Sequence, residues 1–90
     1  MSDNMENDTL FLFETLLKLK SVEEYKNLFD DLCTHKELDS MAQRLNAAKL
    51  LLEGTTYEQI IKQTDISSAT LSRVSKCVQY GKGYKSVLKK

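Results

Sequence analysis

The chain has 90 residues, no proline, three glycines and a formal net charge of zero. This length allows one small domain that is only marginally stable alone, so that a partner subunit would add stability. The scarcity of helix breakers predicts an all-α fold. No apolar run approaches the roughly 18 residues that cross a bilayer, and no targeting segment is recognisable, which predicts a cytoplasmic protein without a membrane partner.

Charge is segregated along the chain. Residues 1–40 carry ten acidic and four basic side chains, a net charge of −6, whereas residues 41–90 carry three acidic and nine basic side chains, a net charge of +6. No acidic side chain follows Asp65. The C-terminal half should therefore attract a polyanion such as nucleic acid, although a cationic tail that only aids solubility is the alternative.

The first predicted element is a helix that begins near Asp8 and runs to Lys20. Residues 1–7 are polar without periodicity and predict a flexible arm. In the helix that follows, leucines and phenylalanines cover more than one face. A helix of this kind must be buried from several sides, and a chain of this size has few elements to do so.

Two more helices are predicted before residue 55. Ser21 and Glu24 have the spacing of a capping box, and open an amphipathic helix over residues 21–33. Thr34 and Glu37 repeat the spacing and open a longer helix that ends before Gly54, a typical C-terminal signal. The apolar stripe of this longer helix is Leu38, Met41, Ala42, Leu45, Ala48, Leu51 and Leu52.

The segment TYEQIIKQTDISSATLSR, residues 56–73, predicts a helix-turn-helix that extends to residue 79. Thr56 suits the N-cap of its first helix, and Gln59 can return the hydrogen bond. Asp65 falls in the turn, where a positive φ is commonly required and Asp is tolerated. Ser67 suits the N-cap of the second helix. The contacts between the two helices are expected from Ile60, Ile61, Ile66, Leu71 and Val74.

A helix-turn-helix places the start of its second helix against base edges in the DNA major groove. The outward positions hold Ser68, Ala69 and Ser72, whose small side chains permit close approach, and we predict that they read bases. The residues better placed for the DNA backbone are Ser67, Thr70, Arg73, Lys76, Lys82 and Lys85. These positions predict a sequence-specific regulator that binds double-stranded DNA. A helical corner within a bundle is the structural alternative, and a protein-interaction module without specific DNA binding is the functional one.

The remaining features favour neither catalysis nor a cofactor. Gly81 and Gly83 precede a short last helix that is expected to dock Tyr84, Val87 and Leu88. The only histidine, His35, suits the opening of a helix, and no nucleophile–base pair, phosphate-binding loop or metal-ligand cluster is recognisable. Cys33 and Cys77 match neither a redox pair nor a zinc spacing, and we expect both to be reduced and half-buried. The protein is therefore not expected to be an enzyme.

The order of three helices, a helix-turn-helix containing A-T-L-S-R, and a short last helix resembles the tryptophan repressor family, in particular its small relatives from Gram-positive bacteria. The resemblance covers residues 10–90 and is strongest over residues 41–74. It implies a single helical domain over residues 8–90, a multi-helix bundle that forms an intertwined homodimer and acts as a repressor.

The resemblance also implies a pocket for a small-molecule effector. In the tryptophan repressor an indole-bearing corepressor lies between two arginines, whose positions match Arg44 and Arg73 here. Val74 stands at the position of a glycine that admits the ring, and Cys77 replaces a serine that helps to hold the ligand. A valine would fill part of the space of an indole, which argues against tryptophan as the effector. Alternatively, Arg44 is a surface residue and Arg73 contacts phosphate.

Overall fold

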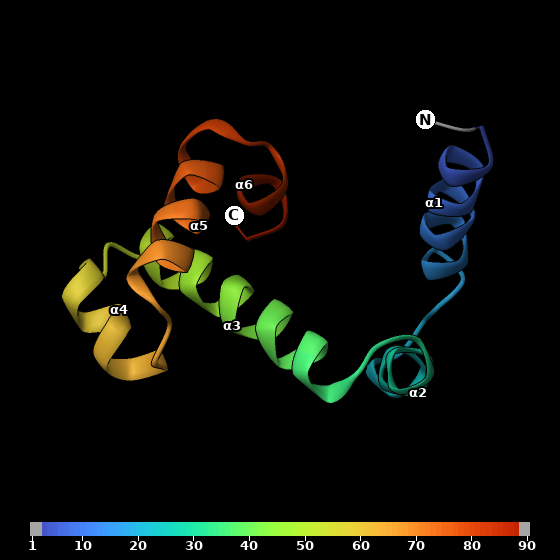
Figure 1. Cartoon of the computed structure of the whole chain (residues 1–90), viewed down its shortest axis with the longest axis horizontal. Helices are drawn as coiled ribbons and strands as arrows, with labels where there is room; N and C mark the ends of the chain where they lie inside the picture. Colours follow the sequence, from blue (N-terminus) through green and yellow to red (C-terminus); the bar gives the residue numbers. More distant parts are fainter. Residues whose placement is uncertain (1–2, 89–90) are drawn as a thin grey trace. The chain divides into compact units, whose positions relative to one another are not determined.

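The computed structural model describes residues 3–88, in which all regular structure is helical (Figure 1). The predicted all-α class is thus confirmed. The helices are α1 (Asp3–Leu16), α2 (Val22–Leu32), α3 (His35–Leu52), α4 (Tyr57–Thr64), α5 (Ser68–Tyr80) and α6 (Gly83–Leu88). Contacts divide the chain into two compact units, residues 1–35 and residues 36–90. Whether residues 8–90 act as a single domain stays a prediction, and each unit is described by itself.

Helix α1 differs from its prediction at both ends. It begins at Asp3 instead of Asp8, so the part of the predicted flexible arm that the structure describes is helical. Once a helical nucleus exists downstream, each added residue costs little, even where the sequence lacks periodicity. The helix ends at Leu16 rather than Lys20, where the Lys18 amide donates to the Thr15 carbonyl at 3.0 Å and tightens the last turn.

Helix α2 begins with only half of the predicted capping box. The Ser21 hydroxyl accepts a hydrogen bond from the Glu24 amide at 3.1 Å, as expected. The Glu24 carboxylate, however, accepts from the Lys20 amide at 2.6 Å instead of returning to Ser21. The two acidic residues in the first turn, Glu23 and Glu24, complement the helix dipole there.

Apolar side chains of the N-terminal unit remain exposed within a single chain. On α1 the exposed fractions are 66% for Phe11 and 56% for Phe13, and Leu17 beyond its end reaches 83%. No side chain of α2 is fully buried. As the sequence predicts, this unit carries more apolar surface than its own two helices can cover.

The C-terminal unit contains the hydrophobic core. Its buried residues come from α3, from α4 and α5, and from the turn between those two helices: Ala47, Ala48, Ile60, Ile66, Leu71 and Val74. Helix α6 packs beside α5 (Figure 1). Of the residues predicted to join α4 and α5, Ile60, Ile66, Leu71 and Val74 are fully buried. Ile61 is half-buried against the same core.

The packed face of α3 differs from the predicted stripe. Ala47 and Ala48 are fully buried, although the sequence pattern included only the second. Ala42 is exposed, and Leu45 is 47% exposed. Ala47 and Ala48 belong to the same buried cluster as the apolar side chains of α4 and α5.

The end of α3 is set by local hydrogen bonds. Gly54 has a φ of 91°, and its amide donates to the Leu51 carbonyl at 3.1 Å, while the Thr55 amide donates to the Leu50 carbonyl at 3.0 Å. This pair of bonds is a Schellman motif, so the predicted glycine stop is confirmed.

In α6, Tyr84 and Leu88 pack against the core, whereas Val87 is 75% exposed, so its predicted docking is wrong.

Candidate nucleic-acid interface

Helix α4 begins with the complete capping box that its sequence predicts. The Thr56 amide donates to the Gln59 side-chain carbonyl, and the Gln59 amide donates to the Thr56 hydroxyl, both at 3.2 Å. Ile60, one residue further, is fully buried. The capping box sets where α4 starts, and Ile60 sets which of its faces meets the core.

The turn after α4 depends on a left-handed residue. Asp65 has φ 60° and ψ 17°, and its amide donates to the Ile61 carbonyl at 3.1 Å. The Thr64 hydroxyl accepts from the Ile66 amide at 3.3 Å. From α3, the Gln43 side-chain amide donates to the Thr64 carbonyl at 2.9 Å. The predicted conformation of Asp65 is confirmed, and these bonds fix the turn against the scaffold helix α3.

Helix α5 begins with a pair of linked hydroxyl groups. The Ser67 hydroxyl accepts from the Thr70 amide at 3.1 Å, which confirms Ser67 as the N-cap. It also donates to the Thr70 hydroxyl oxygen at 2.9 Å. Because the bond between the two hydroxyl groups uses only one of their two hydrogens, the pair retains one donor for a phosphate.

The outward side of α5 is available for contact. Ser68, Ala69 and Ser72 are exposed, whereas Leu71 and Val74 are fully buried on the side that faces the core. The exposure that the sequence predicts for the first three residues is confirmed, while their role in reading bases stays a prediction. We refer to Ser68, Ala69 and Ser72 below as the reading face.

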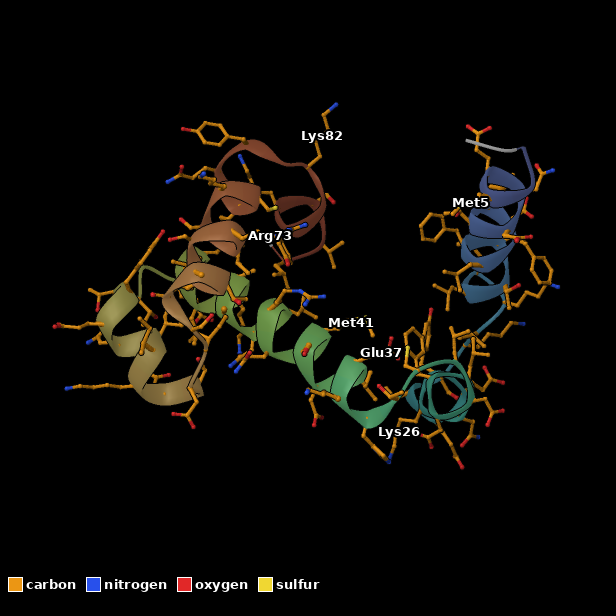
Figure 2. All side chains as sticks on the ribbon, viewed as in Figure 1. Met5, Lys26, Glu37, Met41, Arg73 and Lys82 are labelled. Atoms are coloured by element: carbon orange, nitrogen blue, oxygen red, sulfur yellow. The ribbon has the colours of Figure 1, made fainter. Side chains whose placement is uncertain are left out.

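The predicted cations fall into two groups. Arg73, Lys76 and Lys82 are exposed, and Lys82 projects from the turn between α5 and α6 (Figure 2). Lys85 is half-buried, and its ammonium group donates to the Gln79 carbonyl at 3.0 Å. This bond satisfies a carbonyl in the last turn of α5, where a positive charge is favourable. Lys85 therefore supports the end of α5 and is less free than the other three to reach a phosphate.

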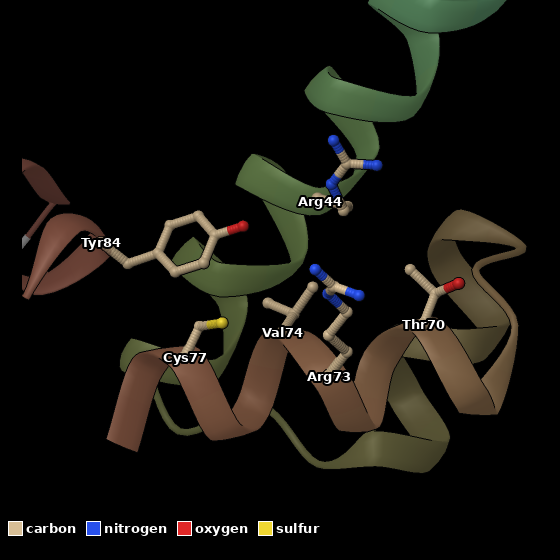
Figure 3. A pocket seen from close by; sticks show the side chains of 6 residues that line it. All are labelled: Arg44, Thr70, Arg73, Val74, Cys77 and Tyr84. Atoms are coloured by element: carbon tan, nitrogen blue, oxygen red, sulfur yellow. The ribbon is translucent and has the colours of Figure 1, made fainter. Parts of the chain in front are cut away.

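A pocket opens between α3, α5 and α6 (Figure 3). It has a volume of about 540 Å³ and is lined by Arg44, Thr70, Arg73, Val74, Cys77 and Tyr84. All four residues of the predicted effector pocket thus line one cavity. Tyr84 is a further lining residue that the sequence did not predict for this pocket; its only signal is an aromatic residue directly after the glycine pair. Cys77 is exposed, so its predicted half-burial is wrong, whereas Cys33 is half-buried and both are free thiols.

Other kinds of site find no support in the part of the chain that the structure describes. Residues 3–88 contain no group of three or more His, Cys, Asp or Glu side chains that could hold a metal ion. Within the same residues, no helix combines the length and hydrophobicity that a membrane crossing requires. The candidate binding features are thus the exposed start of α5, its neighbouring cations and the pocket beside them.

The structure thus contains two helices joined by a fixed turn. Small exposed side chains lie at the start of the second helix, with cations beside them. This is the architecture of helix-turn-helix DNA-binding regulators. The family model described as Trp repressor protein matches residues 7–90, and the chain belongs to this family.

Known proteins agree with this assignment. The chain is 51% identical over 70 residues to YerC, an uncharacterized Bacillus subtilis protein, a match that covers 78% of this chain and 67% of YerC. A solved Staphylococcus aureus structure, described as a candidate Trp repressor, is 40% identical, has a TM-score of 0.87, and is matched over 91% of this chain and 83% of its own. A TrpR-like protein from Eubacterium eligens, also 40% identical, has a TM-score of 0.86, with coverages of 90% and 84%.

Proposed function

We propose that this protein is a sequence-specific DNA-binding transcriptional regulator that acts as a homodimer, most simply as a repressor. The observation that carries the proposal is the division of α5 into two sides. Leu71 and Val74 hold the helix on the core, while the reading face remains exposed. Family membership and the names of the two structural neighbours support the same function.

In this proposal, the side chains of α5 have two different roles. The reading face approaches base edges, where Ser68 and Ser72 offer hydroxyl groups and Ala69 offers a methyl group that can meet a thymine. Thr70, Arg73 and the exposed lysines contact phosphates, which position the helix without specifying a sequence. The role that we assign to Lys85 is instead to support the end of α5, because of its bond to Gln79.

The uncovered apolar surface of α1 supports the homodimer. Leu10, Phe11 and Phe13 of α1 are each more than half exposed in a single chain. A second copy would cover these side chains, and burial would contribute about 25 cal/mol for each Å² removed from water. A symmetric dimer would present two reading faces, which predicts half-sites about 10 base pairs apart, or a multiple of that distance. No enzymatic activity and no cofactor form part of the proposal.

Selection of bound fragments from random duplex DNA tests the proposal. We expect a palindrome, with binding that weakens by orders of magnitude between about 50 and 200 mM salt. Arg73→Ala and Lys76→Ala should weaken binding to all duplexes alike, whereas Ser72→Ala should change the selected sequence. Lys26→Ala, in the acidic N-terminal unit, is the matched control and should change neither property. Equal affinity for every duplex, before and after the serine substitution, would contradict the assignment of the reading face.

The alternative is a protein-interaction module that does not bind specific DNA. The exposed aromatic side chains of α1 favour it, because a large uncovered apolar surface also suits a different protein partner. Salt distinguishes the two functions. Binding through an apolar surface should respond weakly to salt, whereas a protein that neutralises several phosphates should respond strongly.

A further inference from the structure

A hydrogen bond joins the scaffold helix α3 to the turn that precedes α5. The Gln43 side-chain amide donates to the Thr64 carbonyl at 2.9 Å, although 21 residues separate the two in the sequence. Gln43 is half-buried and lies four residues, about one helical turn, before the fully buried Ala47. The packed side of α3 therefore continues beyond its apolar contacts with a polar contact to the turn.

Thr64, the last residue of α4, is bonded through its side chain as well as its carbonyl. Its hydroxyl donates to the Ile60 carbonyl at 2.7 Å and accepts from the Ile66 amide at 3.3 Å. Ile66 directly precedes Ser67, the N-cap of α5. Because these bonds follow one another along the chain, a displacement of Thr64 would pass directly to the start of the helix that carries the reading face.

The bond from Gln43 constrains the turn in a way that the apolar core does not. The core contacts of α3 include the methyl groups of Ala47 and Ala48, and burial of such groups is not directional. A hydrogen bond, in contrast, weakens steeply when its angle or length departs from the optimum. The carbonyls in the last turn of a helix also lack partners within the helix, so Thr64 has an acceptor to offer. Gln43 thus supplies a directional restraint between α3 and the turn.

We propose that Gln43 is a positioning residue that fixes the angle of α5 on α3 and thereby limits the half-site spacing that the protein accepts. This inference rests on the proposed binding of a homodimer to DNA. Two reading faces bind a palindrome together only if each is held at a set angle on its own chain. One added base pair moves a half-site by about 3.4 Å and turns it by about 35°. Gln43 does not line the pocket beside α5, so the restraint requires no bound compound.

Duplexes that differ only in half-site spacing test this role. They carry the selected half-sites at the selected separation, or with one base pair more or fewer between them, and one further duplex carries a single half-site. The measured quantity is the ratio of the affinity at the selected spacing to the affinity at an altered spacing. A substitution that changes the affinity for all duplexes alike, for example through its charge, leaves this ratio unchanged.

Variants of Gln43 separate the hydrogen-bond donor from the length of the side chain. Gln43→Met keeps a similar length without a donor and should reduce the affinity ratio about threefold to tenfold. Gln43→Glu also lacks a donor at neutral pH and should reduce the ratio too. Gln43→Lys restores a donor, whose positive charge suits the end of α4, and should keep the wild-type ratio. Gln63→Met, the same substitution at an exposed position of α4, is the control and should keep it as well.

A purely structural role for Gln43 would give a different pattern. If the side chain only stabilised the fold, Gln43→Met would lower the unfolding temperature and weaken binding to the single half-site, with the spacing ratio unchanged. In the proposed role, the affinity for the single half-site stays near that of the wild type, because the reading face itself is intact. Gln43→Lys keeps the test decisive if Gln43→Met folds poorly.

Amide hydrogen exchange, followed by nuclear magnetic resonance, tests the contact without DNA. The amides of Asp65 and Ile66 are hydrogen-bonded within the turn. Gln43→Met should accelerate their exchange about threefold to tenfold, because opening of the turn no longer breaks the bond to α3. The Leu71 amide, which is bonded at the start of α5, should exchange at the wild-type rate.

The proposal is overturned if Gln43→Met keeps the wild-type affinity ratio, or if Gln43→Lys loses it to the same extent as Gln43→Met. Unchanged exchange at Asp65 and Ile66 would also overturn it, since the turn would then not depend on the bond. The two proposals can fail separately. A protein that selects a palindrome but accepts every spacing equally would retain the proposed function and lose this inference. A protein that selects no duplex would lose both the function and the role in spacing, and the exchange rates would still show whether Gln43 holds the turn.

Discussion

Asp65 offers the most direct test of how the turn between α4 and α5 is built. It has a φ of 60°, the only positive value at a non-glycine residue in the part of the chain that the structure describes. In this left-handed region an L-residue's Cβ approaches the next carbonyl oxygen, at a cost of roughly 1–2 kcal/mol for most side chains. Asp carries less of this cost, because its short polar side chain can hydrogen-bond locally.

We therefore expect Asp65→Ala to lower the free energy of unfolding by about 1 kcal/mol. For a chain of this length such a loss corresponds to a decrease in Tm of about 4–8 °C. Asp65→Gly should stay within about 0.5 kcal/mol of the wild type, because glycine accepts the positive φ but has more freedom in the unfolded chain. Asp65→Asn should behave like the wild type.

Urea unfolding, followed by circular dichroism at one fixed protein concentration, measures these differences. The fixed concentration is necessary because association would make stability depend on it. Asp39→Ala, which removes the same charge from an ordinary helical position of α3, is the control and should change stability by a few tenths of a kcal/mol at most. If the Ala variant of Asp65 were as stable as the wild type and the Gly variant clearly less stable, the turn would not depend on backbone conformation.

Three further substitutions test the core and the ends of α5. Leu71→Ala removes a fully buried side chain and should cost about 2–5 kcal/mol in urea unfolding, more than any exposed position of the same helix. Gly81→Ala should lower Tm, because a Cβ there would lie 2.7 Å from the Cys77 carbonyl oxygen. At Gly83 an added Cβ meets nothing within 4 Å, so Gly83→Ala should be tolerated. Equal Tm values for the two variants would show that the contact with Cys77 does not destabilise the protein. Ser67→Ala should cost about 1 kcal/mol through loss of the N-cap, and Ser68→Ala, measured alongside it, should cost less.

The features that the sequence predicts well are those encoded within a few residues. Thr56 with Gln59 caps α4 and Ser67 caps α5, through side chains that reach only to the next turn, so their spacing identifies these caps. At α2 the same spacing identifies the Ser21 cap but not the partner of Glu24, which bonds to the Lys20 amide. The left-handed conformation of Asp65 is local in the same way. The positions of the reading face follow from these caps, because helical periodicity fixes what lies opposite Leu71 and Val74.

Features that depend on packing between distant segments are predicted less well. The pattern of α3 identifies an apolar side, but the burial of Ala47 and the exposure of Leu45 depend on where α4 and α5 cross it. The sequence predicts that Tyr84 docks, but it does not predict that the side chain lines the pocket, which depends on the packing of α6 beside α5. The predicted docking of Val87 fails for the same reason.

The absence of a buried side chain in α2 and the exposed phenylalanines of α1 have a consequence for how the N-terminal unit acquires its structure. Helices of this length gain most of their stability from tertiary burial rather than from their own hydrogen bonds. In the proposed homodimer, the ordering of α1 and α2 thus becomes a bimolecular event whose rate rises with protein concentration. Amide protons of α1 and α2 would then exchange with solvent faster on dilution, while those around Ile60 and Leu71, inside the core of one chain, would keep their protection.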